Sequence, residues 1–143
     1  MPLARAALYA QGIDVYLAPT WDNSEVWVPT LRHIAREGRT YVIGVTSCIR
    51  ATDLPADLPG RAGLYGGEED WLSRGNSVVI GPDGEVLAGP LVGEEGVLYA
   101  EIDATRARVS RQQFDPVGHY SRPDIFRLCV DTSLRPAVTE TPR

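Results

Sequence analysis

The two cysteines, Cys48 and Cys129, are candidates for a covalent nucleophile. Cys48 follows the apolar run at residues 40–47, at the end of an expected buried strand. A cysteine attacks as its thiolate, so it needs a neighbouring base or a positive field. Nothing in the sequence places His33 or His119 beside it, and an unreactive buried cysteine is the commoner case. Cys129, in "FRLCVD", is expected to be a packed residue for the same reason.

Other chemical signals are incomplete. His119 lies in "GHYSRP", where packing or a subunit contact explains it better than proton transfer, and His33 is expected on a helix surface. Two histidines and two cysteines without paired spacing predict no metal site. "GPDG" lacks the lysine and hydroxyl ending of a phosphate-binding loop, so no nucleotide cofactor is expected.

The stretch "PTWD" is the best candidate for a pocket wall. Thr20, Trp21 and Asp22 directly follow an expected strand at residues 14–19. Ligand sites of α/β sheets gather at the carboxyl ends of strands. Pocket lining and simple entry into the next helix are equally good interpretations of these three residues.

The first fifty residues alternate between helix and strand patterns. An Ala- and Leu-rich run predicts a helix at residues 3–11, ended by Gly12. A second apolar face, from Trp27 to Arg36, predicts a helix that Asn23 or Ser24 can cap and that ends at Gly38. The apolar run at residues 40–47 is of the type that is covered on both faces of a sheet. The class is therefore α/β.

The remaining chain is less regular. Residues 50–75 are rich in Pro, Gly and acids and predict a long loop. Two apolar runs around residues 82–84 predict a β-hairpin, and "GVLYAEID" (96–103) predicts a further strand. A short helix is expected from Asp103 or Thr105 to about Gln113, and the polar tail from Ser133 is expected to fray. One domain at 1–132 and a tail at 133–143 follow.

Composition narrows the function classes. The chain has 143 residues and a net charge of −5, and all 14 basic residues are arginine. No basic stripe is present, so a nucleic-acid partner is not expected. No apolar run is long enough to span a membrane, which favours a cytoplasmic protein. Without lysine, no mechanism that needs a lysine amine can run on this chain alone.

Four stretches carry a family resemblance: "MPLARAALYAQGIDVYLAPTWD", "HIAREGRTYVIG", "GNSVVIGPDGEVLAGPL" followed by "EGVLYAEID", and "FDPVGHYSRPDIF". In this order they resemble the nitrilase family of carbon–nitrogen hydrolases, most closely its nitrilase and cyanide-hydrolysing branch, from residue 1 to about residue 131. The resemblance implies the C-terminal half of an α-β-β-α sandwich, with one sheet face poorly covered.

The resemblance also implies a chemistry that this chain does not contain. Family members use a Glu-Lys-Cys triad, in which the cysteine attacks a nitrile to form a thioimidate and water releases ammonia and a carboxylic acid. The nucleophile precedes the segment that matches Met1, and the other two residues lie earlier still. The chain is therefore expected to be inactive alone, as a truncated gene product, a protein with a misassigned start, or half of a split enzyme.

By the same resemblance, Thr20, Trp21 and Asp22 border the substrate pocket. The first two helices, with Leu3, Trp27 and Leu31, match those that form the family's dimer interface, so a homo-oligomer is expected. The small-molecule partner would be a nitrile. Two other interpretations remain: a non-catalytic binding or assembly module derived from a nitrilase, and an independent cysteine enzyme using Cys48.

Overall fold

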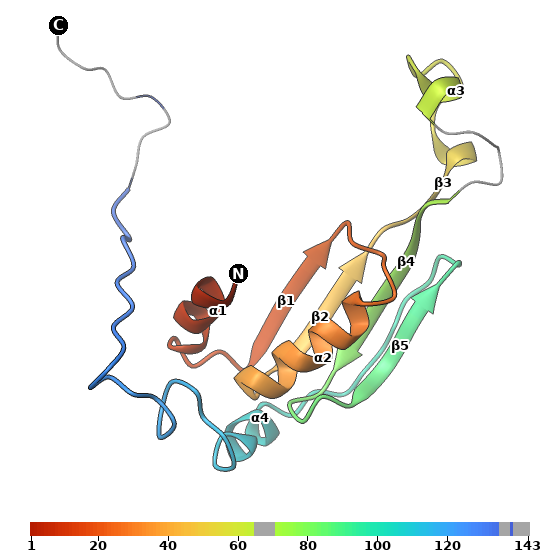
Figure 1. Cartoon of the computed structure of the whole chain (residues 1–143). Coiled ribbons are helices and arrows are strands. Elements are labelled where there is room, and N and C mark those ends of the chain that lie inside the picture. Colours follow the sequence, from red (N-terminus) through yellow and green to blue (C-terminus); the bar gives the residue numbers. More distant parts are fainter. Residues whose placement is uncertain (65–70, 135–137, 139–143) are drawn as a thin grey trace, which may run out of the picture.

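A mixed five-stranded sheet is the centre of the molecule (Figure 1). The computed structural model describes residues 1–64, 71–134 and 138. The strands pair in the order β1–β2–β4–β3, with β5 on β4. Their bounds are β1 Val15–Thr20, β2 Tyr41–Thr46, β3 Cys48–Arg50, β4 Trp71–Ile80 and β5 Val86–Val92. β1 and β2 are parallel, and β4 is antiparallel to β2, β3 and β5.

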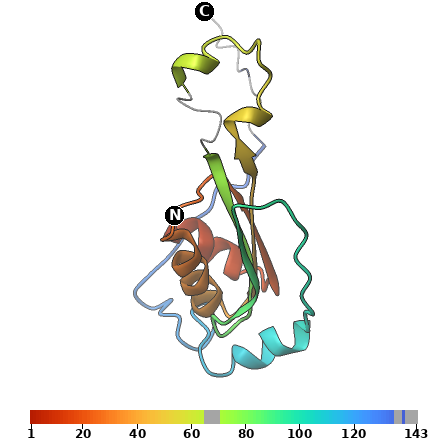
Figure 2. The same ribbon diagram turned by 90° about the vertical axis from the view of Figure 1, so that its right-hand side faces the viewer.

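Two helices cover one face of this sheet. Helices α1 (Pro2–Tyr9) and α2 (Trp27–Gly38) lie on the same side when the sheet is seen edge-on (Figure 2). Leu31 of α2 packs closely on β2, since a Cβ added at Gly44 would come within 2.4 Å of its side chain. The core combines residues from both helices and three strands: Tyr9, Ala18, Leu31, Ile34, Ala35, Val42, Val78 and Ile80. The expected α-β-α-β order and the α/β class are confirmed.

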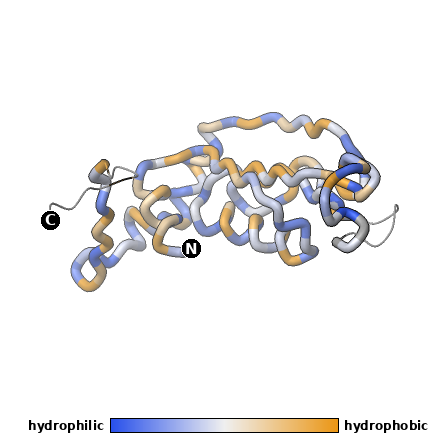
Figure 3. Tube along the Cα trace, turned by 90° about the horizontal axis from the view of Figure 1, so that it is seen from above, coloured by the Kyte–Doolittle hydropathy of each residue, from blue (hydrophilic) through white to orange (hydrophobic). Residues whose placement is uncertain are grey.

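The opposite face of the sheet is largely bare at β1 and β2. Leu17 is 69% exposed and Val45 is 54% exposed, although both are strand residues with apolar side chains. Of the residues that the structure describes, a single segment, 94–103, crosses this side, over β4 and β5 (Figures 2 and 3), where Leu98 approaches Gly89. The expected poorly covered sheet face is therefore present, and the apolar run at 40–47 is not covered on both faces within this chain.

The strand expected at residues 96–103 is absent. This segment carries no strand pairing in the described structure, and Val97 and Tyr99 are strongly exposed. Alternating apolar residues report a half-buried extended segment, whereas a strand also needs a hydrogen-bonding neighbour. The loop expected at 50–75 is shorter than predicted, because β4 already begins at Trp71 and pairs with β3. A 3₁₀ turn at Ala51–Asp53 and the short helix α3 at Arg61–Leu64 lie between these two strands.

The ends of α2 differ from the sequence prediction. The residue at the N-cap is Val26, and neither Asn23 nor Ser24 caps the helix. Gly38 is the last helical residue, and the left-handed position falls on Arg39, with φ at 48°. Glycine is needed at 38 for another reason: a Cβ there would come within 2.4 Å of the Tyr9 ring.

Ion pairs hold the amino ends of β1 and β2. Asp14, just before β1, accepts hydrogen bonds from Arg108 at 3.0 Å and Arg111 at 2.9 Å. The buried Arg39 donates to Asp83 in the β4–β5 turn at 2.7 Å. These contacts fix helix α4 (Ala104–Ser110) and the hairpin turn against the same end of the sheet.

The helix and hairpin predicted for the second half are confirmed. Asp103 caps α4 by accepting from the Thr105 backbone N–H at 2.8 Å. Beyond α4 the chain leaves the sheet, and residues 111–134 form turns and irregular backbone (Figure 1). Most of the expected fraying tail lies outside the described residues, and the domain boundary at 132 stays a prediction. Among the described helices, none is long and apolar enough to cross a membrane.

Candidate functional site

The carboxyl ends of the two parallel strands bring the predicted pocket residues to one edge. Thr20, at the end of β1, lies opposite Thr46, at the end of β2. The Thr20 hydroxyl accepts from the Asp22 N–H at 3.0 Å, and the Asp22 carboxylate accepts from the Ser24 N–H at 2.9 Å. The hydrogen bonds from Ser24 lower the pKa of Asp22. The turn after β1 is thus fixed locally, with Trp21 exposed beside it.

A bulge in β4 connects this turn to the rest of the sheet. Gly75 and Asn76 both have positive φ angles, 87° and 111°, and the β4–β5 pairing shifts register between Gly75 and Ser77. The buried Asn76 side chain donates from Nδ2 to the Ser24 carbonyl at 2.9 Å. Asparagine tolerates this backbone better than most residues. Bulges often re-aim side chains next to functional sites, and here Asn76 turns toward the 20–24 segment.

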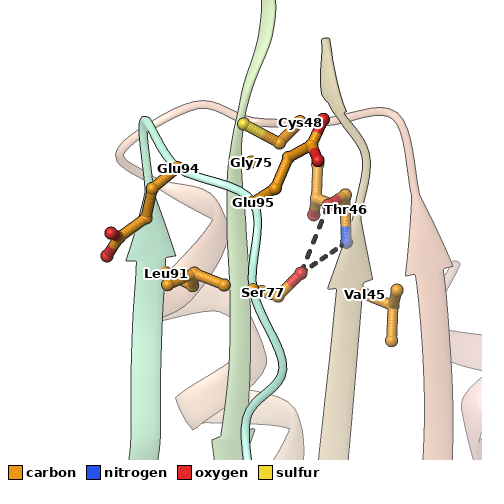
Figure 4. A pocket seen from close by; sticks show the side chains of 9 residues that line it. Val45, Thr46, Cys48, Gly75, Ser77, Leu91, Glu94 and Glu95 are labelled. Atoms are coloured by element: carbon orange, nitrogen blue, oxygen red, sulfur yellow. Dashed lines mark hydrogen bonds between the residues drawn. The ribbon is translucent and has the colours of Figure 1, made fainter.

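Next to this edge lies a pocket of about 230 Å³ (Figure 4). It opens between β2, β4, β5 and the start of the 94–103 segment. The Ser77 hydroxyl spans its base, accepting from the Thr46 N–H at 3.0 Å and donating to the Thr46 carbonyl at 3.2 Å. The lining residues are Val45, Thr46, Cys48, Gly75, Ser77, Leu91, Glu94, Glu95 and Gly96.

The side chain of Thr46 is left without a partner. Thr46 is only 6% exposed, and its Oγ1 has no hydrogen-bond partner among the described residues. A buried hydroxyl without a partner costs on the order of 1–3 kcal/mol, so native structures contain few of them. Because Val45 projects from the bare face and side chains alternate along a strand, the Thr46 side chain lies on the face that α2 covers, with Val42 and Gly44.

Sequence comparison identifies the family to which this chain is similar. A family model described as carbon-nitrogen hydrolase matches residues 1–112.

This chain belongs to the carbon–nitrogen hydrolase family.

Its curated relatives carry nitrilase names. The chain is 42% identical to Nitrilase blr3397 of Bradyrhizobium diazoefficiens over 97% of this chain and 43% of that protein. It is 39% identical to the aliphatic nitrilase of Sinorhizobium fredii, covering 96% of this chain and 44% of the relative. It is 42% identical to Nitrilase 1 of Arabidopsis thaliana, and the match covers 97% of this chain and 41% of that protein. The chain thus spans less than half the length of these relatives, and the expected resemblance is confirmed.

Two solved structures share the fold of this chain. A carbon-nitrogen hydrolase from Helicobacter pylori superposes with a TM-score of 0.65 at 22% identity, covering 87% of this chain and 43% of that one. The NitFhit protein of C. elegans superposes with a TM-score of 0.64 at 20% identity, covering 96% of this chain and 30% of that one. At these identities the match supports the fold alone. The expected part of a nitrilase-type sandwich is confirmed.

Within this carbon–nitrogen hydrolase chain, the side chains that line the pockets beside Cys48 include the carboxylates Glu94, Glu95 and Asp53 but neither histidine. Burial raises the pKa of the Cys48 thiol, and the negative charge of Glu95 raises it further. Both histidines lie elsewhere: His33 Nε2 is 3.6 Å from Glu37 on α2, and the His119 ring contacts Tyr120 at 4.9 Å. Cys48 is therefore protonated at neutral pH. No cluster of three or more metal-binding side chains forms among the described residues.

The sequence predicted that Cys129 is a packed residue, but in this hydrolase chain it lies outside the core. It is exposed, because the irregular segment after α4 leaves the sheet and packs against no second layer.

The three residues expected at a hydrolase dimer interface differ in the solvent exposure of their side chains. Leu3 is 67% exposed on α1. Trp27 is half-buried and packs against the core. Leu31 is fully buried, at 0% exposure, and fills the space over Gly44. Helical periodicity marks an apolar face without saying whether the chain's own sheet covers it, and here the sheet covers Leu31; the dimer interface itself stays a prediction.

The sequence predicted Thr20, Trp21 and Asp22 as a pocket border, which stays a prediction, and it did not indicate four other residues at the same edge. Thr46, Ser77 and Glu95 come from three segments that only the fold brings together. Asn76 had a usable signal: Gly-Asn inside an apolar strand pattern indicates a bulge.

Proposed function

We propose that this chain forms the C-terminal part of a nitrilase that converts a nitrile into a carboxylic acid and ammonia. The nitrilase names of relatives at 38–42% identity support this proposal. In the proposed enzyme, the nucleophilic cysteine, the proton-transferring glutamate and the lysine cation come from polypeptide outside these 143 residues. The absence of any lysine in the chain agrees with that division.

The bare apolar sheet face is the observation that carries the proposal. Leu17 and Val45 project from the face opposite the helices, and exposed apolar surface of this kind marks an interaction site. In an α-β-β-α sandwich a second sheet packs about 10 Å away on such a face. Val45 also lines the pocket, so the covering sheet would close the pocket and bring the reacting groups to it.

The role of this chain is then to shape the substrate site. The cysteine of the completed enzyme would attack the nitrile carbon, and a covalent thioimidate would divide the hydrolysis into two easier steps. A fixed cation would stabilise the negative charge that develops on nitrogen. Thr20, Trp21 and Asp22 would border the substrate, held in place by the turn around Ser24 and by Asn76.

Ammonia release tests this function. The chain alone should release no ammonia from aliphatic or aromatic nitriles, because members of a catalytic triad act as a unit. The same chain joined behind the preceding part of the Bradyrhizobium nitrilase should restore ammonia release. Turnover by the isolated chain that disappears in Cys48→Ala would contradict the proposal and favour an independent cysteine enzyme. A well-folded fusion that turns over no nitrile would favour a non-catalytic module.

We also propose that the protein self-associates through α1 and the exposed side of Trp27, in the cytoplasm. The exposed apolar side chain of Leu3 and the two unpaired cysteines support these two points. A two-fold contact would place the same surface of both copies together. Leu3→Glu should shift the protein to smaller species in light scattering, whereas Glu25→Gln, also on the surface, should not. An unchanged particle size for Leu3→Glu would reject this interface.

A further inference from the structure

We propose that residues 96–102 act as a docking strand, beside which a strand of the preceding polypeptide adds by backbone pairing. This role rests on the proposed function, because it requires preceding polypeptide to complete the fold. The second sheet would then be composite, with one strand from this chain and its neighbours from outside these 143 residues. The path of the segment, its unpaired backbone and its two apolar faces all point to this role.

The docking strand passes over β5 in the opposite direction. A Cβ added at Gly96 would lie 3.1 Å from the Leu91 side chain, and a Cβ added at Gly89 would lie 2.9 Å from the Leu98 side chain. Moving forward along the docking strand therefore means moving backward along β5. Figures 2 and 3 show the segment as a separate layer on the side opposite to α1 and α2. This is the position of a strand in a second, stacked sheet.

The backbone of the docking strand has no partner strand in this chain. None of its N–H or carbonyl groups forms a backbone–backbone hydrogen bond with another described residue. The next N–H, that of Asp103, donates to the Tyr41 hydroxyl at 3.3 Å and fixes the end of the segment. Water can satisfy the unpaired groups while the face is bare. Once a second layer excludes that water, each group needs a protein partner, and an adjacent strand supplies them in a row.

Apolar side chains point to both sides of the docking strand. Side chains alternate along an extended segment, so Ala100 and Ile102 share the face of Leu98, and Val97 and Tyr99 share the opposite face. Val97 is 74% exposed and Tyr99 is 84% exposed. Strands that are apolar on both faces are typical of sheets covered on both sides. We therefore place the docking strand between the first sheet and an outer layer of the preceding polypeptide.

A neighbouring strand has room on the side of β2. The docking strand lies over β4 and β5, so one of its edges faces the bare surface where Leu17 and Val45 project. Adjacent strands lie about 4.8 Å apart and stacked sheets about 10 Å apart, so strands added at this edge would cover both side chains. This chain covers 43% and 44% of two nitrilase relatives, and in a protein of their length the remaining polypeptide is sufficient to supply these strands.

Amide hydrogen exchange tests the docking strand in the isolated chain and in the fusion with, or co-expressed pair with, the preceding part of the Bradyrhizobium nitrilase. In the isolated chain, amides 97–102 should exchange like unstructured peptide. In the completed protein they should exchange at least about 100-fold more slowly, because paired amides exchange only after opening. Unprotected amides in a folded, completed protein would overturn the proposal. Protection in the isolated chain that rises with its concentration would assign the edge to a second copy, and would overturn it too.

Substitution of Tyr99 tests the outer face. Tyr99→Ser should leave the Tm of the isolated chain within about 1 °C, because the ring is exposed there. The same substitution should lower the Tm of the completed protein by roughly 5 °C, since it removes a covered aromatic ring. Tyr99→Phe keeps the ring and should change neither value. Equally small shifts in both proteins would show that nothing covers this face and would overturn the docking strand.

Ammonia release separates the docking strand from the proposed chemistry. A completed protein that protects amides 97–102 but releases no ammonia from nitriles would reject the nitrilase and keep the docking strand. A completed protein that hydrolyses nitriles while these amides exchange freely would reject the docking strand and keep the nitrilase.

Discussion

The two ends of the sheet are built differently. At the amino end of β1 and β2, charged groups are paired: Asp14 with two arginines, and the buried Arg39 with Asp83. At the carboxyl end, Thr46 keeps an orphaned hydroxyl and Glu95 overhangs a pocket. The same sheet thus satisfies its polar groups at one end and leaves them open at the other. Such local deficits are expected where a protein binds something rather than where it maximises stability.

At the amino end of the sheet, the ion pairs also lower the pKa values of the carboxylates. A hydrogen bond from Ser110 lowers the pKa of Asp83, and Arg106 and Arg39 lower it further. Burial opposes the shift at Asp14, but hydrogen bonds from Arg108 and Arg111 outweigh it and lower that pKa too. At the carboxyl end, burial raises the pKa of the Cys48 thiol and the charge of Glu95 raises it further, so the pKa shifts at the two ends have opposite directions.

Removing the charge of Arg39 should have the largest effect on stability. Arg39→Met keeps an unbranched apolar stem but leaves Asp83 without its 2.7 Å partner. Because Asp83 is partly exposed, we expect a loss of about 2–3 kcal/mol, below the cost of breaking a fully buried pair. Urea unfolding measures this. Arg36→Met, at an exposed position on α2, should stay within about 0.5 kcal/mol. Equal effects at both positions would remove the contrast between the sheet ends.

Neutralising Asp14 should cost about 1–2 kcal/mol at neutral pH, the scale of hydrogen bonds to a charged group. Its folded pKa is lowered, so its contribution is present above the unfolded value, about 3.9, and disappears as pH falls through the folded value. The difference between wild type and Asp14→Asn should therefore shrink between about pH 5 and pH 2. A difference that stays constant over this range would show that the ion pairs contribute nothing.

Asn76 tests whether the bulge positions the turn after β1. Asn76→Ala loses the bond to Ser24 and places a Cβ residue at φ 111°, for an expected loss of about 1–2 kcal/mol. Asn76→Gly loses the same bond without the backbone strain and should cost less. Both should speed hydrogen exchange at residues 21–24. Unchanged exchange in both variants would mean that the turn is held by Thr20 and Asp22 alone.

Thr46→Val should be neutral or stabilising by up to about 1 kcal/mol, because it replaces an unpartnered hydroxyl by a methyl group of similar size. Thermal unfolding measures the sign. Thr30→Val serves as the control, since the Thr30 hydroxyl is hydrogen-bonded to the Val26 carbonyl at 2.8 Å and its loss should not stabilise. A clear destabilisation in Thr46→Val would show that this hydroxyl already has a partner in solution.

The smallest expected effect on stability is that of Glu95→Gln, which should change the free energy of unfolding by less than about 0.5 kcal/mol. Its effect should appear at Cys48 instead, because Glu95 raises the pKa of that thiol. Alkylation of Cys48 in a Cys129→Ser background should reach half its maximal rate at a lower pH. An unshifted pH profile would place the Glu95 carboxylate away from the pocket.

Local patterns predicted much of this chain and little of its site. Helical periodicity located α2, Pro82 to Gly84 located the hairpin, and Asp103 located the start of α4, since each signal lies within a few residues. The prediction of a strand at 96–103 was wrong, because the alternation of apolar and polar residues does not reveal whether a pairing strand lies beside the segment. Thr46, Ser77 and Glu95 could not be grouped beforehand, since β-pairing and a returning segment bring together residues far apart in sequence. The burial of Leu31 under its own helix was not visible in the sequence for a similar reason.

Arg39 carries a consequence for the order of folding. Left-handed backbone costs a non-glycine residue roughly 1–2 kcal/mol, and here the compensating contacts, Asp83 and Ser110, lie far along the chain. Local preference and the final fold therefore disagree at this residue until the hairpin and α4 have docked. The last turn of α2 should form late, after long loops have closed. In transition-state mapping, substitutions there should mainly accelerate unfolding, while those at Leu31 should slow folding.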